Sequence, residues 1–177
     1  PPAMIGLDSE GGVMHISAFT KLMGCGLRLG FGAFPESARE SLAKVGFGLA
    51  PSHLTSMAVH EYLKDNKSAY VAGVAASLGR KRDAMLRSLG EYFPPTCTWT
   101  EPQGGMMIWM KLPEGTNTWD ILEKSVEKGV KYNPGPIFRA DRSGGNHLRL
   151  TFSHHTPEEI EEGIAVLAGV FEGEGVI

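Results

Sequence analysis

The chain has 177 residues, of which 42% are hydrophobic and 21% are charged, as is ordinary for a soluble globular protein. The formal net charge of −3 argues against a protein that binds nucleic acid by neutralising phosphates, and no apolar run approaches a membrane span, so neither partner is expected. Cys25 and Cys97 are too few for a disulfide framework, and the first residues do not resemble a signal peptide, so a cytoplasmic protein is expected.

The first half of the chain predicts short strands followed by helices. Apolar runs between turn residues indicate short buried strands at 4–7, 14–19 and 27–34. Prolines and helical apolar spacing then indicate helices from 35 to a fading end around 46–48, from 51 to about 63, and from 68 to 92. Pro94 and Pro95 end the last of these helices.

From residue 96 onward the sequence pattern changes to a mixture of short strands and helices. It predicts strands at 96–100, 106–112, 130–133 and 147–152, and helices at 118–128 and 157–171. We therefore expect an α/β fold in which 1–67 is the end of a large domain, 68–93 is a bridging long helix, and 94–177 is a smaller α+β domain.

One lysine and one arginine share a short glycine-rich turn. Lys21 ends an apolar strand-like run, and Arg28 lies seven residues later, before the next apolar run. Lysine forms Schiff bases with carbonyl compounds, and arginine binds phosphate through a planar fork. A cofactor with an aldehyde and a phosphate, pyridoxal 5′-phosphate (PLP), suits the pair. From spacing alone, two solvated surface charges are the simpler interpretation.

The same segment resembles a family motif. Ala18-Phe-Thr-Lys21, a three-residue spacer, then Cys25-Gly-Leu-Arg28, Leu29 and Gly30 is similar to the lysine motif of class I/II aminotransferases of PLP fold type I, the group of kynurenine, aromatic and 2-aminoadipate aminotransferases. The resemblance implies that Lys21 is the Schiff-base lysine and later shuttles the α-proton. It also implies that Arg28 and Thr20 bind the cofactor phosphate. The sequence departs from the motif at Ala18, where the family has a hydroxyl, and at Cys25, where it has proline.

A second resemblance concerns the C-terminal strand. The segment 146–152, Asn-His-Leu-Arg-Leu-Thr-Phe, is similar to the family motif whose arginine binds the substrate α-carboxylate, which implies that role for Arg149. Strand alternation places Leu148 and Leu150 on one face and Arg149 on the other. From the residues alone, an exposed arginine at a sheet edge is equally compatible. The segments 101–109 and 130–138 also resemble family segments near the substrate, although a hairpin and core packing explain them as well.

The histidines predict no metal site. His154 and His155 are adjacent, so in a strand they point to opposite faces and rarely bind one ion together. No matching cluster of cysteines or acids accompanies them, and no metal is expected.

The resemblance implies a PLP-dependent aminotransferase that exchanges an amino group between an amino acid and a 2-oxo acid, and that forms a homodimer. It covers only the C-terminal part of the fold: the end of the large, mostly parallel-sheet domain and the small C-terminal domain. The residues that stack on the pyridine ring and protonate its nitrogen belong to the other half. We therefore expect the N-terminal half of the same enzyme as a partner, and little activity from this chain alone.

Three alternatives remain open at the level of sequence. The same fold also supports PLP-dependent lyases and decarboxylases. It serves as the sensing domain of PLP-binding transcription regulators. The third alternative is a non-catalytic remnant that acts as an interaction module.

Overall fold

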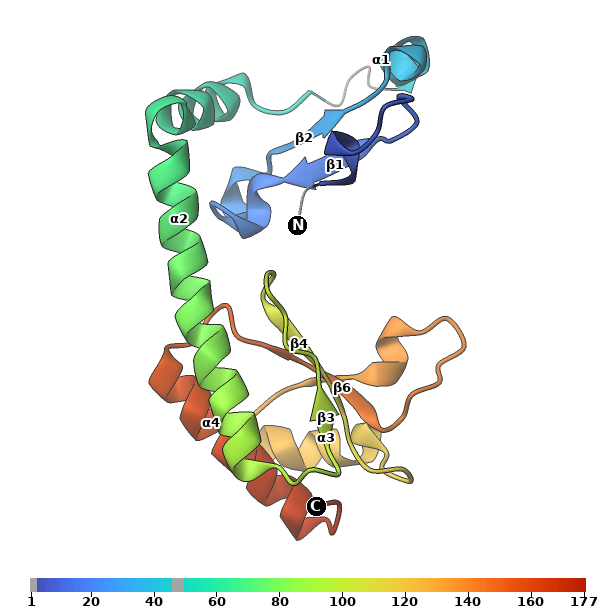
Figure 1. Ribbon diagram of the computed structural model, residues 1–177, viewed down its shortest axis with the longest axis vertical. Helices are drawn as coiled ribbons and strands as arrows, with labels where there is room; N and C mark the ends of the chain where they lie inside the picture. The colour runs from blue at the N-terminus through green and yellow to red at the C-terminus, as the bar shows by residue number, and fades with distance from the viewer. Residues whose placement is uncertain (1–2, 46–49) are drawn as a thin grey trace. The chain divides into compact units, whose positions relative to one another are not determined.

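The structure is a computed structural model that describes residues 3–45 and 50–177. The chain divides into two compact units, Pro1–Val74 and Ala75–Ile177, and the division falls inside one long helix (Figure 1).

The N-terminal unit begins with a turn rather than a strand. The predicted buried strand at 4–7 is wrong: η1, Met4–Gly6, is a 3₁₀ helix in which the Leu7 N–H donates to the Met4 carbonyl at 3.0 Å. Met4 and Leu7 are 74% and 70% exposed. The segment closes on itself because its backbone groups bond locally instead of pairing with a strand.

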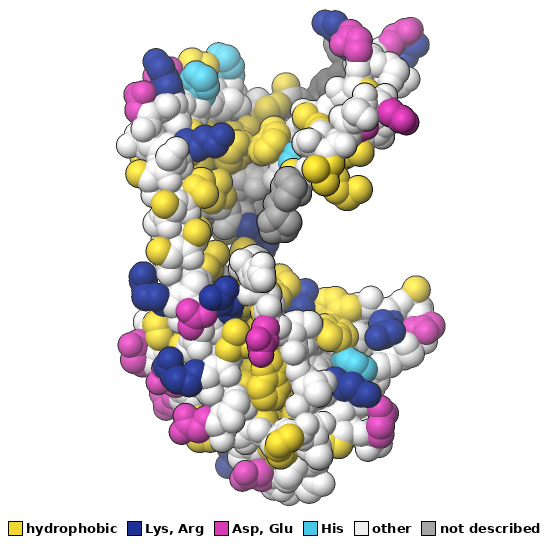
Figure 2. Space-filling view, viewed as in Figure 1, with side chains coloured by type: hydrophobic (Ala, Val, Ile, Leu, Met, Phe, Trp, Pro, Cys, Tyr) yellow, Lys and Arg dark blue, Asp and Glu magenta, His cyan; other side chains and the backbone are white. Residues whose placement is uncertain are grey.

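A hairpin of two antiparallel strands follows. β1, His15–Ala18, pairs with β2, Gly30–Ala33, in a register that places Ala18 opposite Gly30. Both strands were expected, but their predicted burial is wrong, since Ile16 is 75% exposed and every residue of β2 is exposed. Figure 2 shows hydrophobic side chains at the surface of this unit.

Helices complete the N-terminal unit and lead into the second one. η4, Glu36–Ala38, and α1, Arg39–Val45, confirm the helix expected after Pro35, whose predicted end around 46–48 lies outside the described residues. The two helices expected at 51–63 and 68–92 are instead one helix of 40 residues, α2, His53–Tyr92. The intervening Lys-Asp-Asn-Lys contains no proline or glycine, so nothing in it breaks the hydrogen-bond ladder.

The C-terminal unit is built on a four-stranded antiparallel sheet of order β3-β4-β6-β5. The strands are β3, Thr98–Trp99; β4, Met107–Lys111; β5, Asn133–Pro134; and β6, His147–Thr151. The other elements are α3, Thr118–Glu127; η5, Gly135–Phe138; and α4, Pro157–Gly173. Only the end of the strand predicted at 130–133 is present, because just two residues of β5 pair with β6.

One face of this sheet packs into the core. Ile108 and Met110 of β4 and Leu148 and Leu150 of β6 alternate with less buried neighbours, as the sequence pattern predicts. They belong to one buried cluster with side chains of α2 and α4, including Met85, Leu89, Ile164, Leu167 and Phe171. The opposite face of β4 and β6 carries the residues between them and is more open.

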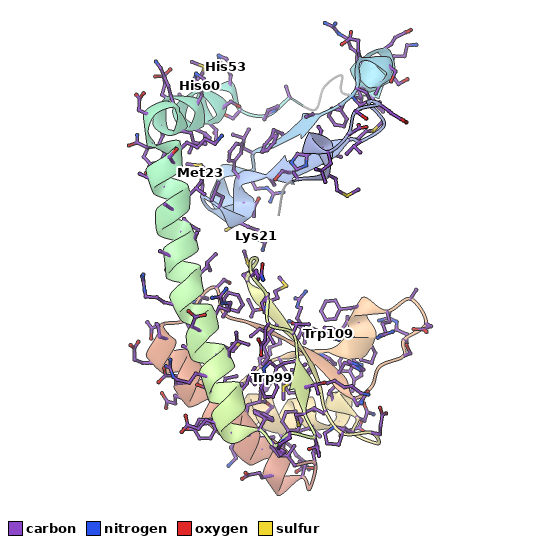
Figure 3. All side chains as sticks on the ribbon, in the orientation of Figure 1. Lys21, Met23, His53, His60, Trp99 and Trp109 are labelled. Carbon is purple, nitrogen blue, oxygen red and sulfur yellow. The ribbon has the colours of Figure 1, made fainter. Side chains whose placement is uncertain are left out.

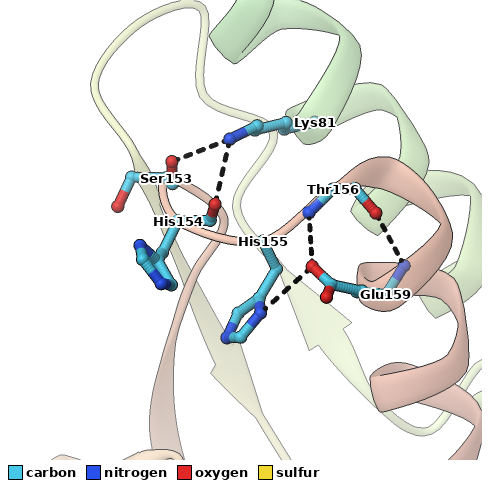
Figure 4. Close-up of polar contacts among 6 residues, drawn as sticks. All are labelled: Lys81, Ser153, His154, His155, Thr156 and Glu159. Atoms are coloured by element: carbon cyan, nitrogen blue, oxygen red, sulfur yellow. Dashed lines mark hydrogen bonds and ion pairs between the residues drawn. The ribbon is translucent and has the colours of Figure 1, made fainter.

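The start of α4 is fixed by a capping box (Figure 4). The Thr156 hydroxyl accepts from the Glu159 N–H at 3.2 Å, and the Glu159 carboxylate accepts from the Thr156 N–H at 2.8 Å. Lys81 of α2 donates to the carbonyls of Ser153 and His154, at 2.9 and 3.3 Å, and so joins this loop to the helix beside it. These contacts account for the sharp turn between β6 and α4.

Residues 3–45 and 50–177 contain neither a metal-binding cluster nor a membrane-spanning helix. No group of three or more His, Cys, Asp or Glu side chains there is placed to hold a metal ion. Within the same residues, no helix combines the length and the apolar character that crossing a membrane requires.

Candidate functional site

Lys21 lies at the turn end of the β1–β2 hairpin (Figure 3). It is the last residue of η2, Phe19–Lys21, and its side chain is exposed. The Phe19 N–H donates to the Leu29 carbonyl at 3.0 Å, and the Phe19 carbonyl accepts from Leu22 and Met23 at 3.1 and 2.7 Å. The lysine therefore stands on a backbone that is held on both sides by hydrogen bonds.

A side chain of α2 tethers the same turn. The Tyr70 hydroxyl donates to the Leu22 carbonyl at 2.8 Å. Phe19 and Leu29 also border a cavity of about 400 Å³ that residues of α2 complete, namely Ser56, Val59, His60, Leu63, Lys64 and Lys67. The residue that follows Lys21 is thus fixed to the long helix within this unit.

Arg28 is held in an unusual backbone conformation. It follows η3, Cys25–Leu27, and has φ 47° and ψ 37°, in the left-handed region that glycine favours. Its neighbour Leu29 is 8% exposed and anchors the turn. At Gly30, two residues after Arg28, a Cβ would lie 2.9 Å from the Ser17 carbonyl oxygen, so the close strand pairing here requires glycine.

Thr20, Lys21 and Arg28 place three hydrogen-bond donors on this turn. In the ranges 3–45 and 50–177, no side-chain hydrogen bond or ion pair engages Thr20, Lys21 or Arg28. The carboxylate of Asp8 is occupied elsewhere, because it accepts from the backbone N–H groups of Val13, Glu10 and Gly11, which lower its pKa. An amine, a hydroxyl and a guanidinium on one turn fit a ligand that carries both an aldehyde and a phosphate.

The structure shows the positions of Ala18 and Cys25, the two residues at which the sequence departs from the family motif. Ala18 and Ser17 are successive residues of β1, so their side chains point to opposite faces, and Ser17 does not replace the missing hydroxyl. Cys25 is an exposed free thiol at the start of η3.

Arg149 lies in the C-terminal unit, in β6, one of the two inner strands of the sheet. It pairs with Trp109 of β4 on one side and with Asn133 of β5 on the other. The strand alternation predicted from sequence is confirmed, since Leu148 and Leu150 are buried and Arg149 is half-buried on the opposite face.

The Arg149 guanidinium packs on the ring of Phe138. Its Cζ lies 4.3 Å from the centre of the Phe138 ring, and its Nε is buried without a hydrogen-bond partner in the part of the chain described. The Trp109 ring meets Phe138 edge-on at 5.6 Å and stacks on His147 at 5.6 Å and 27°. Burial, followed by the charges of Arg139 and Lys111, lowers the pKa of His147. The guanidinium is therefore packed against the Phe138 ring, and within residues 3–45 and 50–177 no acid pairs with it.

Neighbouring residues of the matching segments have packing roles. Tyr132 is buried, and its hydroxyl donates to the Thr118 carbonyl at 2.6 Å, as a packing interpretation predicts. The Asn146 side chain donates to the Leu112 carbonyl at 2.8 Å and fixes the start of β6. A Cβ at Gly135 would lie 2.6 Å from the Gly144 carbonyl oxygen, so this turn also needs glycine.

The sequence patterns assigned no role to His147 or Tyr70. His147 occupies a position that varies in the motif, and Tyr70 lies 48 residues from its partner Leu22, so no local pattern points to either. Phe138 was expected as a packing residue, and its contact with Arg149 depends on how η5 folds back over the sheet.

Comparisons with known proteins agree on one family. The family described as aminotransferase class I and II matches residues 3–167. The chain is 36% identical over 170 residues to aromatic-amino-acid aminotransferase 1 of Thermococcus litoralis, covering 94% of this chain and 41% of that relative. The structure of LysN, the α-aminoadipate aminotransferase of Thermus thermophilus, complexed with N-(5′-phosphopyridoxyl)-L-leucine, matches with a TM-score of 0.89 and 34% identity, covering 98% of this chain and 46% of that one.

A transcription regulator is also similar. The helix-turn-helix type regulator YisV of Bacillus subtilis is 30% identical over 171 residues, covering 95% of this chain and 35% of that protein. The chain therefore spans less than half the length of these relatives. The structural matches confirm the α/β fold class predicted from the sequence.

Proposed function

The chain belongs to the family of class I and II aminotransferases, and from that premise we propose that it forms part of a PLP-dependent enzyme that moves an amino group between an amino acid and a 2-oxo acid. The family's cofactor is PLP, and the Thermus structure holds a phosphopyridoxyl adduct of leucine. The observation that carries the proposal is the turn that carries Lys21, Thr20 and Arg28, none of which pairs with an acid in the part of the chain that the structure describes.

Each residue has a definite part in this proposal. Lys21 would hold the cofactor through Nζ, and the same atom would hold and move the substrate α-proton. Arg28 and Thr20 bind the phosphate, and Arg149 binds the substrate α-carboxylate through its fork. When bound, PLP supplies the electron sink that amino-group transfer requires.

The wider setting of the site belongs to the same proposal. Because the chain spans less than half of its relatives' length, we expect the N-terminal half of the enzyme to complete the site. We further propose a homodimer in the cytoplasm, and little transaminase activity from this chain alone.

Borohydride reduction in the presence of PLP tests the lysine assignment. No Lys or Arg precedes Lys21, so tryptic digestion gives a peptide that ends at Lys21, whereas a phosphopyridoxyl group there blocks cleavage and extends it to Arg28. We expect the adduct mainly at Lys21. The exposed Lys44, Lys64 and Lys67 serve as internal references. Equal labelling of these lysines and Lys21 would contradict the assignment.

Two variants sharpen this test. Lys21→Arg keeps the charge but removes the reactive amine, so the adduct is expected to disappear. Arg28→Lys keeps a cation but loses the planar fork, so labelling of Lys21 should require a higher PLP concentration. If Arg28→Lys labels at the same PLP concentration as the native chain, Arg28 does not bind the phosphate.

The similarity to YisV supports a second candidate, an aminotransferase-like sensing domain of a transcription regulator. Both candidates predict the adduct at Lys21. They differ once the chain is combined with its N-terminal half and given an amino acid. An aminotransferase releases a 2-oxo acid, whereas a sensing domain binds the amino acid without releasing one.

A further inference from the structure

The open face of β4 and β6 holds an unusual pair of atoms. In the described part of the chain, the buried side-chain nitrogens and oxygens without a hydrogen-bond partner are Nε of Arg149 and Nδ1 of His147. Both residues are in β6, two positions apart, and therefore on the same face. A buried polar atom without a partner is unfavourable unless another interaction compensates for it.

Aromatic rings provide that compensation. Phe138 lies under the guanidinium at 4.3 Å, within the range at which a cation is attracted to a ring face. Trp109, which pairs with Arg149 across the two strands, contacts Phe138 edge-on and His147 by stacking.

We propose that Phe138, Trp109 and His147 form an aromatic brace that positions Arg149 for its ligand. Phe138 fixes the plane of the guanidinium and covers Nε. Trp109 keeps Phe138 in place, and His147 keeps Trp109 in place. A carboxylate then meets the guanidinium through the two Nη nitrogens, because Nε is buried. The three are positioning residues, and they act on the ligand only through Arg149.

The charges around the brace are consistent with this role. Arg139 and Lys111 lie near His147 and, together with burial, favour its neutral form, while Glu114 acts in the opposite sense. A neutral imidazole stacks on indole without adding another positive charge beside Arg149.

The Nε–Hε resonance of Arg149 reports the brace directly. Arg149→Lys assigns the signal by removing it. In the native chain we expect the signal to be displaced by the Phe138 ring current and its proton to exchange slowly with water, because Nε is buried. Phe138→Leu should return the signal to the range of exposed arginines and accelerate exchange, and Phe138→Tyr should restore the native values. An unchanged signal in Phe138→Leu would overturn the proposal.

The outer rings are tested in the same way. Trp109→Leu and His147→Leu should both accelerate exchange at Nε, whereas Trp109→Phe and His147→Phe, which keep a ring, should do so less. Trp119→Leu is the matched control, since Trp119 is 48% exposed on α3 and contacts none of the brace rings in the described structure. If Trp119→Leu changes the signal as much as Trp109→Leu, the effect is not specific to the brace and the proposal fails.

A carboxylate titration connects the brace to the proposed function, on which the identity of the ligand rests. The probe is 3-phenylpropanoate, which has a carboxylate but no carbonyl that could react with lysine. We expect Phe138→Leu to weaken binding of the probe about 3- to 10-fold, because the cation–π contact between Phe138 and Arg149 is lost. Equal affinities of Phe138→Leu and the native chain would contradict the positioning role. If no variant binds the probe, even when the chain is combined with its N-terminal half, although the resonance responds as expected, the brace stands and the carboxylate role of Arg149 fails.

Discussion

Gly135 sits in the turn that carries Phe138 toward Arg149, and replacing it with alanine should strongly destabilise the C-terminal unit. A Cβ there would lie 2.6 Å from the Gly144 carbonyl oxygen and 2.7 and 2.8 Å from Cβ and the carbonyl oxygen of His147. Two of these atoms are backbone and have no rotamer to change, so the turn or the start of β6 must move.

The size of the effect follows from that geometry. Overpacking in well-packed regions costs about 1–3 kcal/mol, and Gly135→Ala belongs near the upper value because rigid atoms surround the new methyl group. With a urea dependence of about 1.5 kcal/mol/M, a loss of about 3 kcal/mol lowers the unfolding midpoint by about 2 M.

Tryptophan fluorescence measures this unit alone. The three tryptophans of the chain all lie in the unit Ala75–Ile177: Trp99, Trp109 and Trp119. Gly169→Ala is the control, because a Cβ at this helical glycine of α4 meets nothing within 4 Å, and alanine should raise stability there by about 1 kcal/mol. If Gly135→Ala unfolds at the same urea concentration as the native chain, the steric reasoning is refuted.

Two further predictions concern other contacts. Tyr70→Phe removes the hydrogen bond to the Leu22 carbonyl, so trypsin should cleave after Lys21 about 2- to 10-fold faster, whereas Tyr62→Phe, which changes an exposed neighbouring ring, should leave the rate unaltered. The pKa of Glu159 is lowered because its carboxylate accepts a hydrogen bond from the Thr156 backbone N–H at the start of α4. The stabilising effect of this carboxylate is therefore fully present above pH 4.5 and is lost as the pH falls through the lowered pKa. Urea midpoints of the native chain and Glu159→Gln should therefore converge in acid, and a difference that stays constant with pH would contradict this assignment.

Local patterns predicted the parts of the structure that local chemistry determines. Pro157 and the acids that follow it indicated the start of α4, and Pro94 indicated the end of α2. The alternation of Leu148, Arg149 and Leu150 predicted which face of β6 is buried, because a strand has a fixed period of two residues.

Other features depend on contacts that the sequence does not display. Two helices were predicted on either side of 64–67, but a helix continues through polar residues when no proline or glycine intervenes. The apolar residues from Met4 to Leu7 form a turn, since apolar character alone does not distinguish a strand from a short helix. The packing of Phe138 on Arg149 required the tertiary structure, because the two residues belong to different elements.

Arg28 shows a trade-off between stability and recognition within a single residue. An arginine in the left-handed region is less favourable than glycine by about 1–2 kcal/mol, and here φ is 47°. Arg28→Gly should therefore make the turn more stable while removing the guanidinium from the proposed phosphate site. Selection for thermal stability alone would favour glycine at this position. The presence of arginine is what selection for a bound anion would maintain.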